Sequence, residues 1–167
     1  MPKNNMMFIS HRGNLIGKNK FHENHLTAIK NVIETGYTVE VDLWSKDNFF
    51  YLGHDRPENL VEYDFLKLYS NKLFIHCKND EALFKLKNDT DFEFFTHTED
   101  QFTLSSKNTI LLNPFTKTNH RDCILMMPEM SNYDLNEILK FKGIISDNIK
   151  FYENHYNSFR KQRTIYQ

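Results

Sequence analysis

Short apolar segments alternate with helix-like patterns along most of the chain. The apolar segments predict strands at 6–10, 37–43, 73–77, 92–95, 109–112, 124–127 and 143–145. Apolar residues at helical spacing predict helices at about 25–35, 62–69, 80–86 and 134–141, and a last helix from 148 onward. Residues 98–101 resemble a capping box and predict one further helical turn. This order is typical of an α/β protein with parallel strands joined by right-handed crossovers.

Nearly every predicted strand ends in a polar residue. These residues are His11, Asp42, His76, His97, Asn113, Glu129 and Asp147. In a β/α barrel the carboxyl ends of the strands gather at one mouth, where chemistry is done. We therefore predict a compact, abbreviated TIM-type (β/α) barrel, with a few helices reduced to turns because a full barrel usually needs ~200 residues or more. An open doubly wound sheet is the alternative, but no glycine-rich phosphate loop follows any strand.

Composition narrows the class of protein further. The length of 167 residues fits one domain, residues 1–167, and 40% hydrophobic residues are enough for a core. A net charge of −1 favours neither nucleic acid nor an anionic membrane as a partner. No segment predicts a signal peptide or stable membrane insertion, and neither cysteine has zinc-site spacing, so a cytoplasmic protein is expected. The sequence carries no signal for the oligomeric state.

An acid pair stands on the second predicted strand. Glu40 and Asp42 are two residues apart, so they point to the same face. Two adjacent carboxylates repel unless one binds a proton or a cation lies between them, and a hard cation is the simpler solution. After a turn at 46–48 and an apolar run at 49–52, Gly53, His54 and Asp55 follow. Solvated acids at a sheet edge and a surface histidine are the alternative interpretation.

Four short motifs occur in a fixed order: HRG at 11–13, EN at 23–24, EVD at 40–42 and GHD at 53–55. This order resembles the glycerophosphodiester phosphodiesterase family, in the superfamily of phospholipase C-like barrels. The segment GIISD at 143–147 also resembles the closing strand of that family. The similarity covers the first third of the chain well and its end weakly, and the order of four motifs is more specific than any one of them.

The resemblance implies metal-dependent hydrolysis of a small phosphodiester, plausibly like a glycerophosphodiester. His11 and His54 are then the general acid and base, in an order that the sequence leaves open. Glu40 and Asp42 would bind a divalent metal ion, Mg²⁺ or Ca²⁺ by resemblance. Arg12 and Lys78 suit a phosphate. Supporting roles follow for Glu23 (orienting Arg12 or helping the metal), Asn24 (capping the helix or touching phosphate) and Asp55 (fixing the His54 tautomer or closing a turn).

The third predicted strand departs from the family pattern. The family has E-x-K there, with the glutamate as the third metal ligand, whereas this chain has His76, Cys77 and Lys78. An imidazole ligand shifts the preference toward Mn²⁺ or Zn²⁺. A core histidine is the alternative for His76. Trp44 points with the acids and would stack on substrate or plug the barrel, and His97 would touch the substrate or support the site.

Two rival functions remain open at this point. A non-catalytic barrel that binds phosphate or a phospholipid headgroup would keep the pocket after losing turnover with the third acid. A phosphodiester lyase would use the same residues and release a cyclic phosphate. The position of His76 distinguishes the first rival, because an imidazole that reaches the acid pair favours catalysis with a different ion.

Overall fold

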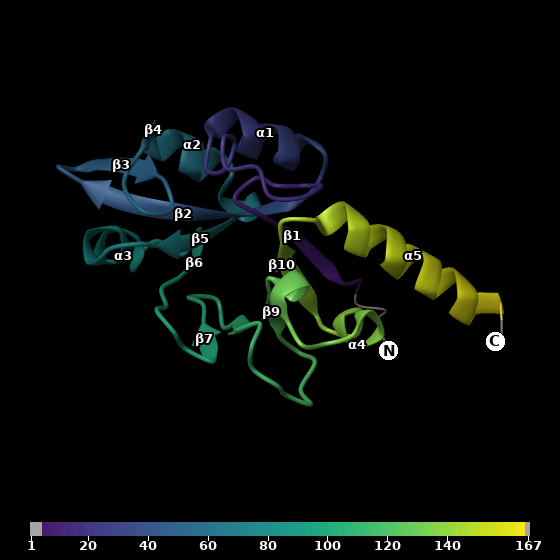
Figure 1. The fold of residues 1–167 in the computed structure, drawn as a ribbon. Helices are drawn as coiled ribbons and strands as arrows, with labels where there is room; N and C mark the ends of the chain where they lie inside the picture. The colour runs from purple at the N-terminus through teal and green to yellow at the C-terminus, as the bar shows by residue number, and fades with distance from the viewer. Residues whose placement is uncertain (1–4, 166–167) are drawn as a thin grey trace.

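The structure is a computed structural model that describes residues 5–165. It is a mixed α/β fold with one curled sheet of ten strands (Figure 1). The strands are β1 Met7–His11, β2 Thr38–Lys46, β3 Phe49–Leu52, β4 Asn59–Val61, β5 Leu73–Cys77, β6 Glu93–Phe95, β7 Phe102–Leu104, β8 Ile110–Leu112, β9 Ile124–Met126 and β10 Gly143–Ser146. The helices are α1 Leu26–Glu34, α2 Tyr63–Leu68, α3 Asp80–Leu86, α4 Leu135–Ile138 and α5 Ile149–Ile165, with 3₁₀ turns η1 Ser70–Lys72 and η2 Pro128–Met130.

The parallel strands follow one another in the order β6, β5, β2, β1, β10, β9, β8. The hairpin β3–β4 extends β2 antiparallel beyond this run, and β7 pairs antiparallel with β8. The turn after β7 contacts β6, where the Ser106 amide donates to the Phe94 carbonyl at 2.8 Å. No strand ladder joins β6 to the β7–β8 hairpin within residues 5–165.

Side-chain alternation divides the core between the two faces of the sheet. Along β2, Val39, Val41 and Leu43 point outward into a cluster with α1, α2 and α3. Glu40 and Asp42 point to the inner face, where apolar side chains form a separate cluster below them. That inner cluster consists of Ile9, Phe74, Phe95, Leu111, Ile124, Met126 and Ile145. The inside of the curled sheet is therefore apolar at its base and polar toward the carboxyl ends of β1, β2 and β5.

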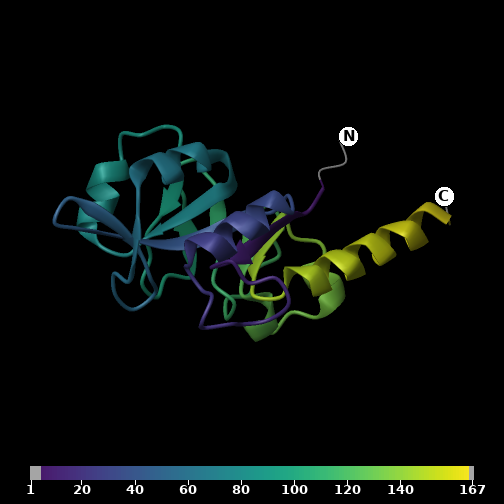
Figure 2. The same ribbon diagram turned by 90° about the horizontal axis from the view of Figure 1, so that it is seen from above.

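The helices cover the outer face unevenly. Helices α1, α2 and α3 lie over the β2–β5 side, and α5 packs on β1 and β10 (Figures 1 and 2). The segments that join β6 to β7, β7 to β8 and β8 to β9 contain no helix in the described chain. The short helices and bare connections agree with the abbreviated architecture predicted from the chain length. No helix within residues 5–165 is both long and apolar enough to cross a lipid bilayer.

Most predicted elements are confirmed within one to three residues, and β5 and α3 agree closely, with Asn79 capping α3 by accepting from the Ala82 amide. The predicted helical turn at 98–101 is wrong, because this segment is a bend that leads into β7. Its Asp100 carboxylate accepts from the Thr98 amide, a local turn bond rather than a helix cap. Strands β3, which is the apolar run at 49–52, β4 and β7 are additional elements. The helix predicted at 134–141 keeps its capping box at Asp134 and Glu137 but ends at Ile138.

Candidate functional site

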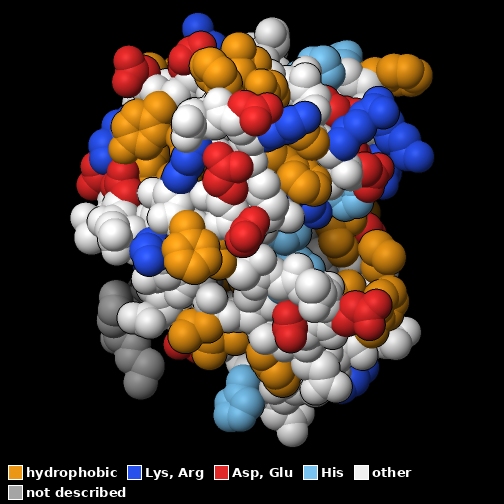
Figure 3. Space-filling model, turned by 90° about the vertical axis from the view of Figure 1, so that its left-hand side faces the viewer, with side chains coloured by type: hydrophobic (Ala, Val, Ile, Leu, Met, Phe, Trp, Pro, Cys, Tyr) orange, Lys and Arg blue, Asp and Glu red, His pale blue; other side chains and the backbone are white. Residues whose placement is uncertain are grey.

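A cavity of about 550 Å³ opens at the carboxyl ends of the parallel strands. Its polar side is lined by His11, Arg12, Glu40, His54, His76, Lys78 and His97. Its apolar side is lined by Phe95, Pro114, Met126, Met127, Met130 and Ile145. Figure 3 shows histidine side chains near the middle of one face of the molecule, among basic and hydrophobic side chains. Seven of the twelve predicted site residues therefore share one cavity, although they come from distant parts of the chain.

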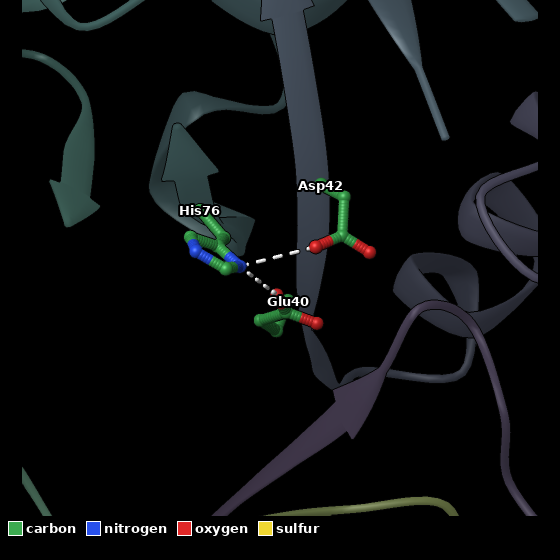
Figure 4. A group of neighbouring side chains, drawn as sticks. All are labelled: Glu40, Asp42 and His76. Atoms are coloured by element: carbon green, nitrogen blue, oxygen red, sulfur yellow. Dashed lines mark hydrogen bonds and ion pairs between the residues drawn. The ribbon is translucent and has the colours of Figure 1, made fainter. Parts of the chain in front are cut away.

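Glu40, Asp42 and His76 form a buried cluster beside this cavity, which Glu40 and His76 line. Asp42 and His76 are opposite each other in the parallel pairing of β2 with β5. The His76 Nδ1 atom lies 3.1 Å from Asp42 Oδ1 and 4.0 Å from Glu40 Oε1 (Figure 4). One possible ligand atom from each of the three residues lies within 4.8 Å of the others. The predicted placement of His76 beside the acid pair is confirmed.

The residues of this cluster suit a divalent cation. Glu40 Oε2 is buried and has no hydrogen-bond partner within the described structure, an arrangement that costs free energy unless something else binds there. The carboxylates of the surrounding network are those of Glu23, Glu40, Asp42 and Asp147, and the fixed cations paired with them are Arg12 and Lys78. The mixed nitrogen and oxygen donors and the unpartnered oxygen both fit an ion such as Mn²⁺ or Zn²⁺.

The two acids have opposite pKa shifts. Burial, together with the adjacent Asp42 charge, raises the pKa of Glu40. Burial would raise the pKa of Asp42 as well, but the hydrogen bond from His76 and the charges of Arg12 and Lys78 hold it well below its usual range. Without a metal ion, Glu40 is thus the acid that more readily takes up a proton, and a bound cation would replace that proton.

Asp42 is also held by Asn24 through two hydrogen bonds. The Asn24 amide group donates to Asp42 Oδ2 at 2.9 Å, and the Asp42 backbone amide donates to Asn24 Oδ1 at 3.0 Å. Asn24 is 1% exposed, and the cap position of α1 belongs to His25, which makes no side-chain cap bond. The predicted helix-cap role of Asn24 is therefore wrong, whereas its predicted phosphate contact stays a prediction. Its buried position lets it orient a metal-ligand candidate instead.

The predicted phosphate-binding cations both contact Asp42. Arg12 Nε lies 2.7 Å from Asp42 Oδ2, although without the angle of a hydrogen bond, and Lys78 Nζ lies 3.5 Å from Asp42 Oδ1. Glu23 contacts Arg12 at 3.4 Å and accepts from the Asn14 side chain at 3.1 Å. Of the two predicted roles of Glu23, the geometry agrees with orienting Arg12. It does not place Glu23 in the metal cluster.

His11 is paired with an aspartate from the other end of the chain. His11 Nδ1 lies 2.7 Å from Asp147 Oδ1, and its Nε2 lies 3.9 Å from Glu40 Oε2. Burial opposes the charged imidazole, but the hydrogen bond to Asp147 and the Glu40 charge together raise the pKa of His11. Asn14 also donates to Asp147 at 2.8 Å. The sequence placed Asp147 at a strand end but did not indicate that His11 is its partner. The parallel pairing of β1 with β10 brings the two residues together.

His54 approaches the cavity from the loop after β3. Its Nδ1 lies 2.7 Å from Asp55 Oδ1, which agrees with a role for Asp55 in fixing the tautomer. Partial burial and the charges of Arg12 and Lys78 lower the pKa of His54. Gly53 begins this turn with φ of +156°, and a side chain there would meet the Arg56 carbonyl at 2.1 Å. The motif glycine is thus required by the close return of the backbone.

Two aromatic predictions have different outcomes. Trp44 is not among the residues that line the cavity, and its indole nitrogen donates to the Gly53 carbonyl at 2.6 Å. Trp44 does not belong to the apolar cluster inside the curled sheet, so its predicted role as a barrel plug is wrong, whereas stacking on substrate stays a prediction. His97 does line the cavity, and its ring stacks on His76 with centroids 4.7 Å apart. That position supports the metal-cluster histidine.

The apolar side of the cavity is the part that sequence reasoning missed. Met126 ends β9, and Met127 follows it in a left-handed conformation with φ of +45°. Met130 ends η2 and is 52% exposed. A methionine pair at a strand end was the available signal, but it is equally typical of a core strand. A scan of protein-family models finds no match to this chain, and no curated protein sequence matches it.

Proposed function

We propose that this protein is a metal-dependent phosphodiester hydrolase of the glycerophosphodiester phosphodiesterase type. The observation that carries this proposal is the convergence of His11, His54 and the Glu40–Asp42–His76 cluster on one cavity. These residues belong to the motifs that resemble the family, and they lie at the carboxyl ends of parallel strands or in the loops beyond them. Such an edge is where β/α barrels carry their active sites.

The finer fold belongs to the same proposal. The turn after β7 reaches β6 through the Ser106–Phe94 hydrogen bond, and apolar side chains fill the inside of the curled sheet. An abbreviated TIM-type barrel accounts for both features, with the β7–β8 hairpin standing where a complete barrel has a further strand and helix. The missing outer helices explain how 167 residues suffice.

The residues divide the chemistry among themselves. Arg12 and Lys78 lie beside Asp42, where they would share their charge between that carboxylate and the non-bridging oxygens of a phosphodiester. A divalent ion held by Glu40, Asp42 and His76 would supply Lewis-acid stabilisation of the charge that develops on phosphorus oxygens. The protein contributes the orientation of these groups, which Asn24, Glu23 and Asp147 fix through the bonds described above.

His11 and His54 are suited to proton transfer because their pKa values shift in opposite directions. The pKa of His11 is raised and that of His54 is lowered, so near neutral pH one imidazole holds a proton more readily than the other. An acid and a base that differ in this way serve attack by water. They would equally serve attack by a neighbouring hydroxyl of the substrate, which is the lyase alternative.

The two-sided cavity favours a phosphodiester with one apolar substituent. Arg12, Lys78 and the histidines face the phosphate position, while Met126, Met130 and the other apolar residues offer a surface for the organic group. Thioether side chains adapt to irregular apolar groups. The volume of about 550 Å³ is in the usual range for small-molecule sites.

A non-catalytic binding barrel is the second candidate. It is favoured by one observation, since Arg12 and Lys78 already neutralise Asp42 and form a cationic site that binds a phosphate group without needing an ion. Against it, His76 lies with the acid pair, as expected for a working metal centre.

The test is hydrolysis of bis(p-nitrophenyl) phosphate and glycerophosphocholine. Purified protein is assayed with EDTA and then with Mg²⁺, Ca²⁺, Mn²⁺ and Zn²⁺ in turn. His11→Ala and Glu40→Ala are compared with His155→Ala and Glu34→Ala, which change exposed residues on α5 and α1. The proposal predicts metal-dependent turnover in the wild type and both controls, and none in the two site variants.

The rival functions give different results in the same assay. Phosphate binding without turnover under any ion, in a protein with native circular dichroism, would support the binding barrel and reject the hydrolase. Release of a cyclic phosphate product, seen by ³¹P NMR, would identify the lyase. Turnover that survives in Glu40→Ala would locate the chemistry elsewhere.

A further inference from the structure

We infer that the Glu40–Asp42–His76 cluster selects a transition-metal ion, such as Mn²⁺, Co²⁺ or Zn²⁺, over Mg²⁺ and Ca²⁺, and that His76 is the residue that determines this selection. The inference rests on the proposed function only for the presence of a metal site. It does not depend on which reaction, if any, the bound ion supports.

The first reason is the direction of the imidazole. His76 Nδ1 is the ring nitrogen that faces the two carboxylates, at 3.1 Å from Asp42 Oδ1 and 4.0 Å from Glu40 Oε1, and the other ring nitrogen points away (Figure 4). Two ligand atoms that each lie about 2.0–2.2 Å from one ion are separated by about 3 Å when they are adjacent in its coordination shell. Small rearrangements of Glu40 would therefore bring all three donors onto one ion.

The second reason is that the imidazole cannot easily leave the site. His76 is 9% exposed, and its ring stacks on Phe95 with centroids 4.8 Å apart and on His97 with centroids 4.7 Å apart. Phe95 ends β6, the strand that pairs with β5, and His97 lies in the segment just after it. Turning the ring away to leave only oxygen donors would break both stacks. The nitrogen donor is thus a fixed part of the site.

The third reason is the small number of free oxygen donors. Asp42 Oδ2 accepts from Asn24 and lies 2.7 Å from Arg12 Nε, so only Oδ1 faces the cluster. Among the described residues, no other acid joins Glu40 and Asp42 in a group of this kind. Ca²⁺ takes about six to eight oxygen ligands, which this site does not offer. Mg²⁺ needs fewer protein oxygens, so the nitrogen of His76 is what separates it from the transition metals.

The experiment measures metal binding directly on EDTA-treated, dialysed protein. Dissociation constants for Zn²⁺, Co²⁺, Mn²⁺, Mg²⁺ and Ca²⁺ come from isothermal titration calorimetry, and pulsed electron paramagnetic resonance of bound Mn²⁺ detects a directly bonded nitrogen. The variants are His76→Glu, which makes the donors all oxygen, and His76→Gln. His120→Gln, at an exposed loop histidine, is the matched control.

The expected result is a strong preference that His76→Glu removes. Wild type and His120→Gln should bind the transition metals at least ~100-fold more tightly than Mg²⁺ and Ca²⁺, in the order Mn²⁺, Co²⁺, Zn²⁺ of increasing affinity, and show the nitrogen coupling. His76→Glu should lower that ratio by ~100-fold and lose the coupling. If three clustered acids prevent folding, His76→Gln must still lose the nitrogen coupling.

Either of two results would overturn the inference. One is binding of Mg²⁺ or Ca²⁺ by the wild type as tightly as Mn²⁺ or Zn²⁺. The other is a nitrogen coupling that persists after His76 is replaced. Failure of the proposed function gives a different result. A protein with the expected metal preference but no phosphodiester turnover would support this inference and reject the hydrolase. Phosphodiester turnover in a protein that binds Mg²⁺ as tightly as Mn²⁺ would keep the hydrolase and reject this inference.

Discussion

The two sides of the curled sheet are built differently. Strands β1, β2 and β5 alternate with helices that cover them, and they bear the metal-ligand candidates and His11. The side made of β6 to β9 is connected by turns and loops, and its β7–β8 hairpin exposes Phe102, Leu104 and Ile110. Polar groups that need fixed positions lie on the helix-covered side. The loop-connected side contributes the apolar wall of the cavity, where position matters less.

Replacing Glu40 tests the helix-covered side with the largest expected effect. Glu40→Gln keeps the shape of the side chain but removes a buried charge beside Asp42, so we expect metal-dependent turnover to fall to the EDTA background. The metal-induced rise in melting temperature should also be lost. In EDTA the variant should be at least as stable as wild type, because the repulsion with Asp42 is gone. Calorimetry with and without Mn²⁺ measures both effects.

The matched control is Glu34→Gln on the exposed face of α1, which should keep turnover and the metal-induced stabilisation. A Glu40→Gln protein that still gains stability from Mn²⁺ would contradict the assignment of Glu40 as a ligand.

Replacing Asp147 tests how the closing strand positions His11. Asp147→Asn removes the charge that lies 2.7 Å from His11 Nδ1, so turnover should fall by about 10²-fold while KM changes little. Initial-rate kinetics over a pH series measure this. An equal loss at every pH, accompanied by a large rise in KM, would indicate damage to substrate binding instead of the positioning of His11.

The same pair gives stability a specific pH dependence in EDTA. Because the folded pKa of His11 is raised, protonated His11 contributes stability that is fully present below its unfolded pKa of about 6.5. This contribution is lost as pH rises through the folded pKa. Asp147→Asn should therefore cost about 3 kcal/mol near pH 5.5 and less at pH 8.5 in urea unfolding. A cost that grows with pH would have the wrong sign.

Changing the apolar wall tests the loop-connected side, with a smaller effect. Met130→Ser should raise KM for bis(p-nitrophenyl) phosphate by about three- to tenfold, because aromatic groups lose apolar contact area, and should barely change kcat. Met7→Ser is the control. Met7 is a comparably exposed methionine at the start of β1, the end of that strand away from the cavity, and it does not line the cavity. Equal effects of the two substitutions on KM would show that the apolar wall does not contact the substrate.

The two cysteines report the same contrast through labelling rates. Both thiols are buried, and burial raises the pKa of Cys77 to about 12 and also raises that of Cys123. Neither should react quickly with a thiol reagent near neutral pH. Cys123, next to β9 on the loop-connected side, should be labelled before Cys77 on β5, since local opening is easier where fewer helices pack. Mass spectrometry of timed samples gives the order, and faster labelling of Cys77 would contradict the contrast.

Local sequence patterns predicted the helix-covered side best. The β5 and α3 segments follow from an apolar run and from apolar residues at helical spacing. The β7 segment was missed because it is only three residues long, too short for a clear alternating pattern. Its two apolar side chains, Phe102 and Leu104, are exposed in the structure and do not pack in the core. The helical turn predicted at 98–101 is wrong for a different reason, because a capping-box sequence also forms isolated bends.

The site was predictable where its residues follow one another along a strand or a motif. The facing of Glu40 and Asp42 follows from strand periodicity alone. The bond between His11 and Asp147, the bond between Asn24 and Asp42, and the methionine wall depend on which strands become neighbours. Those neighbours are set by the way the sheet curls, which no short segment of sequence encodes.

The central claim is that a metal ion and a phosphodiester meet in this one cavity. The direct measurement is the ³¹P relaxation rate of glycerophosphocholine with Mn²⁺ and the His11→Asn protein, in which turnover is suppressed. We predict a large increase in relaxation caused by bound Mn²⁺ near the phosphorus, present with His11→Asn and lost when Glu40→Gln is added. No increase when Mn²⁺ is shown to be bound, or an increase that survives the added Glu40→Gln, would contradict the account.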